Sequence, residues 1–168
     1  YIMEEFVNGY VQTYDAIIDS KGEPLFESGN ITPHSLMDIV NGGGDSVYYL
    51  VKDLPERIRD AGLRTVKSFG VKSRFIHLEF FILNEDQEGL GKKGDILGLE
   101  VNMRPAGGYT PEMYNYSQQT DVYKIWADMV AFDTNTKGTG KHFYCAFYSR
   151  RDGKTYKLSD HDIMTRYA

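Results

Sequence analysis

The sequence predicts an α+β fold, with a mostly antiparallel β-sheet flanked by helices. Segments in which apolar and polar residues alternate, joined by turns, indicate antiparallel strands. Segments with apolar residues at helical spacing indicate helices. The chain has 168 residues, of which 41% are hydrophobic and 14% aromatic. It therefore has enough large apolar side chains to bury a core and to exclude disorder.

The first third of the chain predicts a hairpin and a helix. Residues 11–19 form the first expected strand, and a glycine-containing turn leads to a short partner strand at 24–27. An irregular loop is expected over 30–46. Asp53 is the expected N-cap of the helix, and Gly70 is well placed to end it.

The middle of the chain predicts a second pair of strands. Residues 74–83 alternate strictly, so that Ile, Leu and Phe side chains gather on one face. Alternation resumes over 97–104, after the polar, glycine-containing connector 84–95. One such connector between two strands indicates an antiparallel pair.

The last third predicts a helix, a hairpin and a second helix. Thr120 is the expected cap of a helix with an apolar stripe at positions i, i+3, i+4, i+7 and i+8. Strands at 141–150 and 155–158 are expected to form a hairpin. Ser159, with Asp162 three residues later, resembles a capping box for the final helix.

Composition excludes several classes of protein. The net charge is −5, from 19 basic and 24 acidic residues, which argues against a dedicated nucleic-acid partner. The single cysteine, Cys145, excludes an intramolecular disulfide framework, and we interpret it as a buried small hydrophobe. No apolar run approaches the ~20 residues that span a bilayer, so no membrane association is expected. The expected location is the cytoplasm.

One face of the second strand pair carries unusual polar residues. Glu100, Asn102 and Arg104 alternate along one strand, and Glu79 lies near the middle of the preceding strand. If the two strands pair as neighbours, the two carboxylates can converge. Carboxylates and an amide oxygen are hard ligands that suit Mg²⁺, and a nearby Arg suits a developing anionic charge. This pattern indicates a site for a nucleotide and a metal, and a solvated charged face is the alternative.

Two segments carry a resemblance to a known family. Residues 75–81 read Phe-Ile-His-Leu-Glu-Phe-Phe, and residues 99–108 read Leu-Glu-Val-Asn-Met-Arg-Pro-Ala-Gly-Gly. Together they resemble the C-terminal half of an ATP-grasp domain, the fold of biotin carboxylase, carbamoyl-phosphate synthase and many carboxylate–amine ligases. The resemblance implies that Arg104 is catalytic and steadies the acyl-phosphate or its tetrahedral successor. It also implies ATP and Mg²⁺ (or Mn²⁺) as cofactors, with the metal held by Glu79, Glu100 and Asn102.

The start of the chain resembles the adenine-binding hinge of the same family. The resemblance implies that Glu4 or Glu5 reaches the ribose and that Phe6 and Val7 line the adenine slot. It assigns residues 1–132 to the C-terminal subdomain of the ATP-grasp fold, beginning at this hinge. Residues 133–168 are then a hairpin and helix extension.

The resemblance also predicts a function and partners. A fragment of a longer, ATP-dependent carboxylate–amine ligase is expected, which activates a small-molecule carboxylate as an acyl-phosphate for attack by an amine or similar nucleophile. The rest of the ATP-grasp domain is an expected partner, a homodimer is possible, and the isolated chain is expected to be inactive. The alternative is a non-catalytic nucleotide-, carbohydrate- or protein-binding module that uses Tyr109, Tyr114 and Tyr116. His77 is interpreted as a structural histidine rather than a base or ligand.

Overall fold

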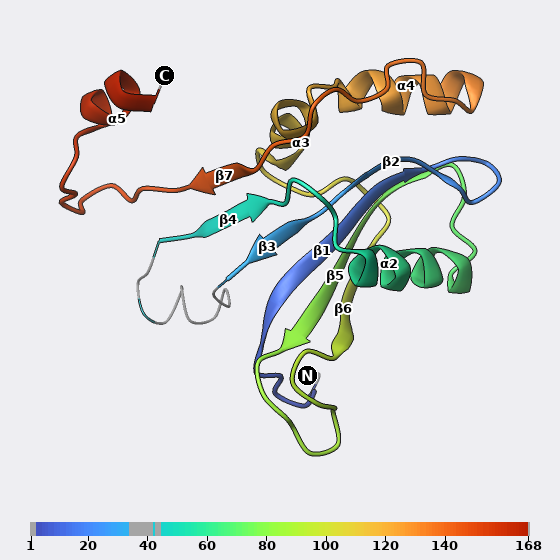
Figure 1. The fold of residues 1–168 in the computed structure, drawn as a ribbon, viewed down its shortest axis with the longest axis horizontal. Helices are drawn as coiled ribbons and strands as arrows, with labels where there is room; N and C mark the ends of the chain where they lie inside the picture. The colour runs from blue at the N-terminus through green and yellow to red at the C-terminus, as the bar shows by residue number, and fades with distance from the viewer. Residues whose placement is uncertain (1–2, 34–41, 43–44, 168) are drawn as a thin grey trace.

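The chain folds around one antiparallel sheet. The computed structural model describes residues 3–33, 42 and 45–167. Seven strands follow the order β6-β5-β1-β3-β4-β7, with β2 also paired to β1, and helices lie on both faces (Figure 1). The expected α+β fold is therefore confirmed. The strands are β1 (Gly9–Ile18), β2 (Pro24–Ser28), β3 (Asn30–Thr32), β4 (Val47–Leu50), β5 (Arg74–Leu83), β6 (Ile96–Asn102) and β7 (Cys145–Tyr148); the helices are α2 (Glu56–Ser68), α3 (Thr110–Gln118), α4 (Val122–Phe132) and α5 (Asp160–Tyr167).

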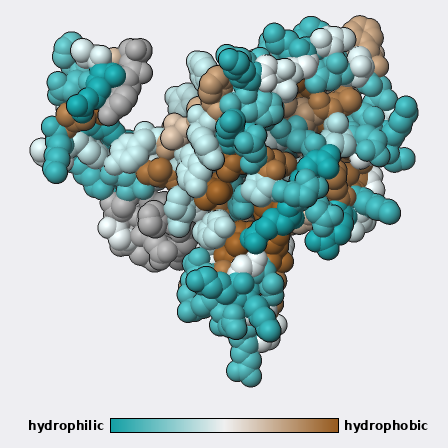
Figure 2. Space-filling view, viewed as in Figure 1, coloured by the Kyte–Doolittle hydropathy of each residue, from teal (hydrophilic) through white to brown (hydrophobic). Residues whose placement is uncertain are grey.

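The two faces of the sheet bury separate clusters of apolar side chains. Alternation along β1 and β5 sends successive side chains to opposite faces, and the two strands pair along their whole length. The face under α2 buries Tyr14, Ala16, Ile58, Ala61, Ile76, Leu78, Phe80 and Ile82. The opposite face packs against α3 and α4 and buries Ile17, Phe26, Phe75, Met113, Tyr114, Val122 and Ile125. The surface of the connector between β5 and β6, at the bottom of the view, is hydrophilic (Figure 2).

Helix α2 approaches the sheet closely at one residue. A Cβ atom added to Gly62 would lie 2.3 Å from Cγ of Tyr14, which is fully buried. Because no side chain fits at this distance, glycine is what allows the helix to pack flat on β1.

Several expected elements are confirmed and the two expected helix caps are wrong. The hairpin β1–β2, the strand β5 and its antiparallel partner β6 are present. Helix α2 begins at Glu56 after Pro55, with no side-chain cap, so Asp53 is not its N-cap. Helix α4 is capped by Asp121, whose carboxylate accepts from the backbone N–H of Lys124 at 3.0 Å. Thr120, the expected cap, instead donates to the carbonyl of Gly138.

The C-terminal hairpin is also wrong. Only Cys145–Tyr148 forms a strand, and β7 pairs with β4 rather than with residues 155–158. Strand β7 pairs with the distant strand β4 instead of forming a local hairpin. This pairing is favoured because the outer edge of β4 would otherwise be unpaired. The capping box of α5 is confirmed, since Asp162 N–H donates to Ser159 Oγ and Ser159 N–H donates to the Asp162 carboxylate.

The irregular loop expected at 30–46 contains β3 at its start, and residues 34–41 and 43–44 lie outside the described residues. The division of the chain at residue 132 stays a prediction. Among the described residues, no helix is long and apolar enough to cross a membrane.

Candidate active site

The register of three strands brings the predicted metal ligands onto one face of the sheet. Glu79 of β5 lies opposite Glu100 of β6, and His77 lies opposite Asn102. Directly opposite residues of an antiparallel pair point to the same face, with Cβ atoms about 4.5–5.5 Å apart. The two carboxylates and the amide are thus neighbours on the face that α3 and α4 leave partly open.

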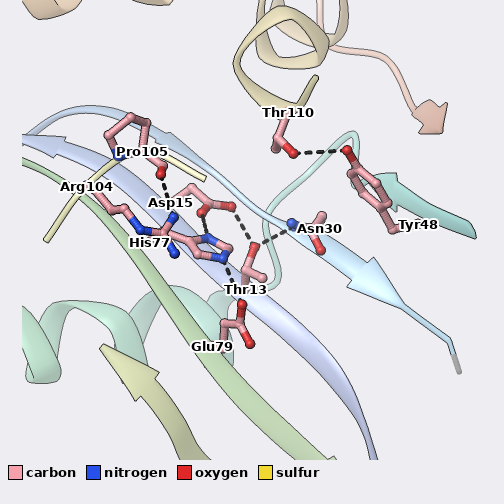
Figure 3. A network of polar contacts seen from close by, with 9 residues as sticks. All are labelled: Thr13, Asp15, Asn30, Tyr48, His77, Glu79, Arg104, Pro105 and Thr110. Carbon is pink, nitrogen blue, oxygen red and sulfur yellow. Dashed lines mark hydrogen bonds and ion pairs between the residues drawn. The ribbon is translucent and has the colours of Figure 1, made fainter. Parts of the chain in front are cut away.

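His77 lies between two carboxylates in this arrangement (Figure 3). Its Nδ1 is 2.5 Å from Asp15 Oδ1, and its Nε2 is 2.9 Å from Glu79 Oε1. Burial by itself lowers the pKa of His77, but the hydrogen bonds to Asp15 and Glu79, together with their charges, raise that pKa to about 10. At neutral pH the ring is therefore an imidazolium that donates from both nitrogens.

The network continues into β1 and β3. Thr13 Oγ1 donates to the second oxygen of Asp15 at 2.6 Å, and the backbone N–H of Asn30 donates to Thr13 Oγ1 at 2.9 Å (Figure 3). Asp15 is fully buried, so this network satisfies both oxygens of a carboxylate that has no access to water. The imidazolium of His77 fixes the orientation of Glu79 from one side, and the other side of that carboxylate remains free for a ligand.

The chemistry of this face fits a magnesium–phosphate group. Glu79 and Glu100 supply carboxylates, and Nδ2 of Asn102 is buried without a hydrogen-bond partner. An orphaned amide donor beside carboxylates suits a phosphate oxygen or a metal-bound water. No group of three or more His, Cys, Asp or Glu side chains in the described part of the chain is arranged to hold a metal ion. The predicted ligand set of two carboxylates and one amide is of another kind, in which phosphate oxygens and waters complete the octahedron.

Within the described residues, the other predicted site residues make no hydrogen bond to this cluster. Strand β6 ends at Asn102, so Arg104 lies in the following turn, where its guanidinium donates to the carbonyl of Pro105 at 2.9 Å. The hinge residues precede β1. Glu4, Glu5 and Phe6 are exposed and Val7 is partly buried. Their assigned roles stay predictions.

The hinge is attached to the connector between β5 and β6. The backbone N–H of Asn8 donates to Gln87 Oε1 at 3.0 Å, and Gln87 Nε2 donates to the carbonyl of Asn8 at 2.9 Å. The backbone N–H of Asn84 also donates to that carbonyl. These bonds hold the segment just after the hinge at the start of β1, five residues before Thr13, which lies opposite Glu79.

A hollow of about 490 Å³ lies beside the carboxylates on the same face. Its floor is formed by side chains from β1, β3 and β5, and its walls by β4, β7 and the turn that leads into α3. The lining residues are Val11, Thr13, Asn30, Thr32, Ser46, Tyr48, His77, Glu79, Ala106, Gly107, Gly108, Tyr109, Thr110 and Phe147.

Sequence reasoning missed several of these residues. Asp15 stands in a strand with no local signal of a partner, and only the β1–β5 register brings it to His77. Tyr48 and Phe147 reach the hollow through the long-range pairing of β4 with β7. Of the tyrosines proposed to stack ligands, Tyr109 lines the hollow, but Tyr114 is fully buried in the core, where burial and the charge of Asp15 raise its pKa.

The arrangement of the sheet and helices is an ATP-grasp arrangement, as the resemblance of the two strand motifs predicts. Among solved structures, the chain is similar to the phosphoribosylglycinamide synthetase of Anaerococcus prevotii, with a TM-score of 0.60 and 17% sequence identity. The alignment covers 84% of this chain and 35% of that chain. This likeness shows a shared fold. Comparisons with protein-family models and with curated protein sequences give no match.

Proposed function

We propose that this chain forms the C-terminal half of the nucleotide site of an ATP- and Mg²⁺-dependent carboxylate–amine ligase. The observation that carries the proposal is the register that sets Glu79, Glu100 and Asn102 on one face, beside the imidazolium of His77. Mg²⁺, or Mn²⁺ in its place, would neutralise the phosphate charge of ATP when bound to these three residues.

The nucleotide in this proposal lies along β1 and β5. The hinge, with Glu4 and Glu5 at the ribose and Phe6 and Val7 at the adenine, stands at the start of β1. Thr13, opposite Glu79, lies four residues further along the strand than Gly9. At about 3.3 Å per residue this is roughly 13 Å, so the base would lie at the start of β1 and the phosphates near its middle.

The reaction in this proposal is phosphorylation of a carboxylate followed by attack of an amine or similar nucleophile. The chain contributes positioning and charge: His77 orients Glu79, and Arg104 stabilises the acyl-phosphate or its tetrahedral successor once its guanidinium leaves Pro105. The rest of the ATP-grasp domain is the proposed partner that completes the site, so we expect the 168-residue chain alone to be inactive. Cytoplasmic location and a homodimer are part of the same proposal.

We do not assign the substrate of the similar enzyme to this chain. Its name refers to a phosphorylated ribosyl product, and a phosphate group calls for Arg or Lys side chains. The described lining of the hollow contains no Lys and no Arg. We therefore propose a different substrate for this ligase.

Metal binding by the chain itself tests the proposal. Mn²⁺ affinity, measured by water-proton relaxation in the presence of a non-hydrolysable ATP analogue, should fall at least about tenfold in Glu79→Gln and in Glu100→Gln, because each removes a charged ligand. Glu88→Gln is the matched control, since Glu88 is exposed in the connector after β5. Mn²⁺ affinity that is the same in all four proteins would contradict the proposal.

A non-catalytic nucleotide-, carbohydrate- or protein-binding module is the second candidate. The aromatic side chains around the hollow favour it, because rings bind sugars and bases without any chemistry. ATP turnover by the full-length parent distinguishes the two candidates.

A further inference from the structure

The hollow has an aromatic wall at the end away from the carboxylates. The rings of Tyr48 and Phe147 stack with centroids 5.0 Å apart, and the rings of Tyr109 and Phe147 stack with centroids 6.1 Å apart. These three rings come from β4, β7 and the turn before α3, which lie far apart in the sequence. The hydroxyls of Tyr48 and Thr110 are 3.0 Å apart and tie β4 to the start of α3 (Figure 3).

The opposite end of the hollow is polar and carries the charged groups. His77 and Glu79 lie on β5, and three strand spacings across β1 and β3 separate them from Tyr48 on β4. At about 4.8 Å per spacing this is roughly 14 Å between backbones. That span accommodates an acidic group beside the metal ligands and a ring beside the aromatic wall.

One polar side chain lies on the floor of the hollow. Asn30 is 5% exposed and lines the hollow. Its backbone N–H is bonded to Thr13, but its carboxamide makes no hydrogen bond to any described residue. A carboxamide on the floor of the hollow offers a ligand both a hydrogen-bond donor and an acceptor.

The backbone around Gly107 and Gly108 adds polar groups to the lining. These residues line the hollow and lead into the first turn of α3, a helix of nine residues. The first turn of α3 itself offers few donors, because the Thr110 N–H donates to the carbonyl of Gly107 and Pro111 has no N–H. With Asn30, this region forms a polar middle section between the metal ligands and the aromatic wall.

We infer that the hollow binds the carboxylate substrate of the proposed ligase, and that this substrate carries an uncharged aromatic ring which packs against Tyr48 and Phe147. The inference rests on the proposed function for the identity of the reacting group, and on the aromatic wall for the ring. The described lining offers hydroxyls from Thr32, Ser46 and Thr110 at this end, with no Lys or Arg to hold a phosphate. Phe147 is thus a specificity-determining residue supplied by the C-terminal segment.

Ligand binding to the 168-residue chain tests this inference directly. The probes are 3-phenylpropanoate, 3-cyclohexylpropanoate of similar shape without a π-system, and ribose 5-phosphate, each followed by saturation-transfer NMR without metal or nucleotide. The aromatic acid should bind more tightly than its cyclohexyl analogue. Phe147→Ala should weaken it by about 2- to 12-fold, which is the value of one aromatic pair.

Tyr148→Ala is the matched control, because Tyr148 neighbours Phe147 on β7, is 59% exposed and is not part of the lining. It should leave binding unchanged. Equal binding of the two ring acids, preferential binding of ribose 5-phosphate, or no effect of Phe147→Ala would overturn the inference. Failure of the metal test with intact aromatic binding would instead refute the proposed ligase, so the two failures are distinguishable.

Discussion

Replacing His77 with Asn should strongly destabilise the chain, because it removes the cation between two carboxylates. Asp15 is fully buried and His77 is 7% exposed, so water cannot replace the lost partner. Breaking a buried ion pair by removing one partner costs about 3–5 kcal/mol. A rise in pKa from 6.5 to about 10 gives a similar ceiling of about 5 kcal/mol for the contribution of His77.

The same pair predicts how stability depends on pH. A group whose pKa is higher in the folded than in the unfolded state stabilises the fold fully below its unfolded pKa, and this stabilisation is lost as pH rises through the folded pKa. For His77 the window runs from 6.5 to about 10. The difference in unfolding free energy between the wild type and His77→Asn should therefore shrink by about 3 kcal/mol from about pH 6 to about pH 9.

Urea unfolding at the two pH values, in the presence of a chelator, measures this difference. His161→Asn is the control, since His161 is exposed on α5. If His77→Asn does not fold, the double variant with Asp15→Asn should recover stability, because it removes the unpaired buried charge. A His77→Asn variant as stable as the wild type, or a difference that grows with pH, would refute the assigned ion pair.

Two further substitutions test the packing of α2 and the catalytic assignment. Gly62→Ala should cost about 1–3 kcal/mol in urea unfolding, since the new Cβ would lie 2.3 Å from the Tyr14 ring, whereas Gly98→Ala, with open space around it, should be neutral. In the proposed ligase with a complete ATP-grasp domain, Arg104→Lys should lower kcat at least about tenfold with little change in the KM for ATP, because a point charge does not reproduce a planar guanidinium. A near-normal kcat would remove Arg104 from the anion-stabilising role.

The parts of the fold that sequence predicts correctly are those set by local patterns. The alternation over residues 74–83 predicts both the strand and which of its faces is buried. A shift of the register by one residue would expose the buried face to water. The capping box at Ser159 is equally local. The prediction of Asp53 as a cap is wrong because the helix begins only at Glu56, directly after Pro55. The path of the chain over the sheet, rather than the local sequence, sets this boundary.

The residues of the candidate site also differ in whether local patterns predict them. Glu79 and Glu100 were accessible to sequence reasoning because they lie on consecutive strands joined by one connector, so their pairing follows from the simplest topology. Asp15 was not accessible, since it lies 62 residues from His77 and nothing in its own strand marks it as a partner. The sequence also does not predict the place of Phe147 in the site, because β7 pairs with the distant strand β4 rather than forming a local hairpin.

The two halves of the site therefore depend on different pairings. The register of β5 with β1 and β6 sets the charged end, through His77 and its two carboxylates. The pairing of β4 with β7 sets the aromatic end, through Tyr48 and Phe147. Strand β7 makes few contacts outside β4 and α3, so its residues can change without disturbing the buried network around Asp15. Within the proposed ligase, this separation would allow the substrate to change while the groups that hold nucleotide and metal stay fixed.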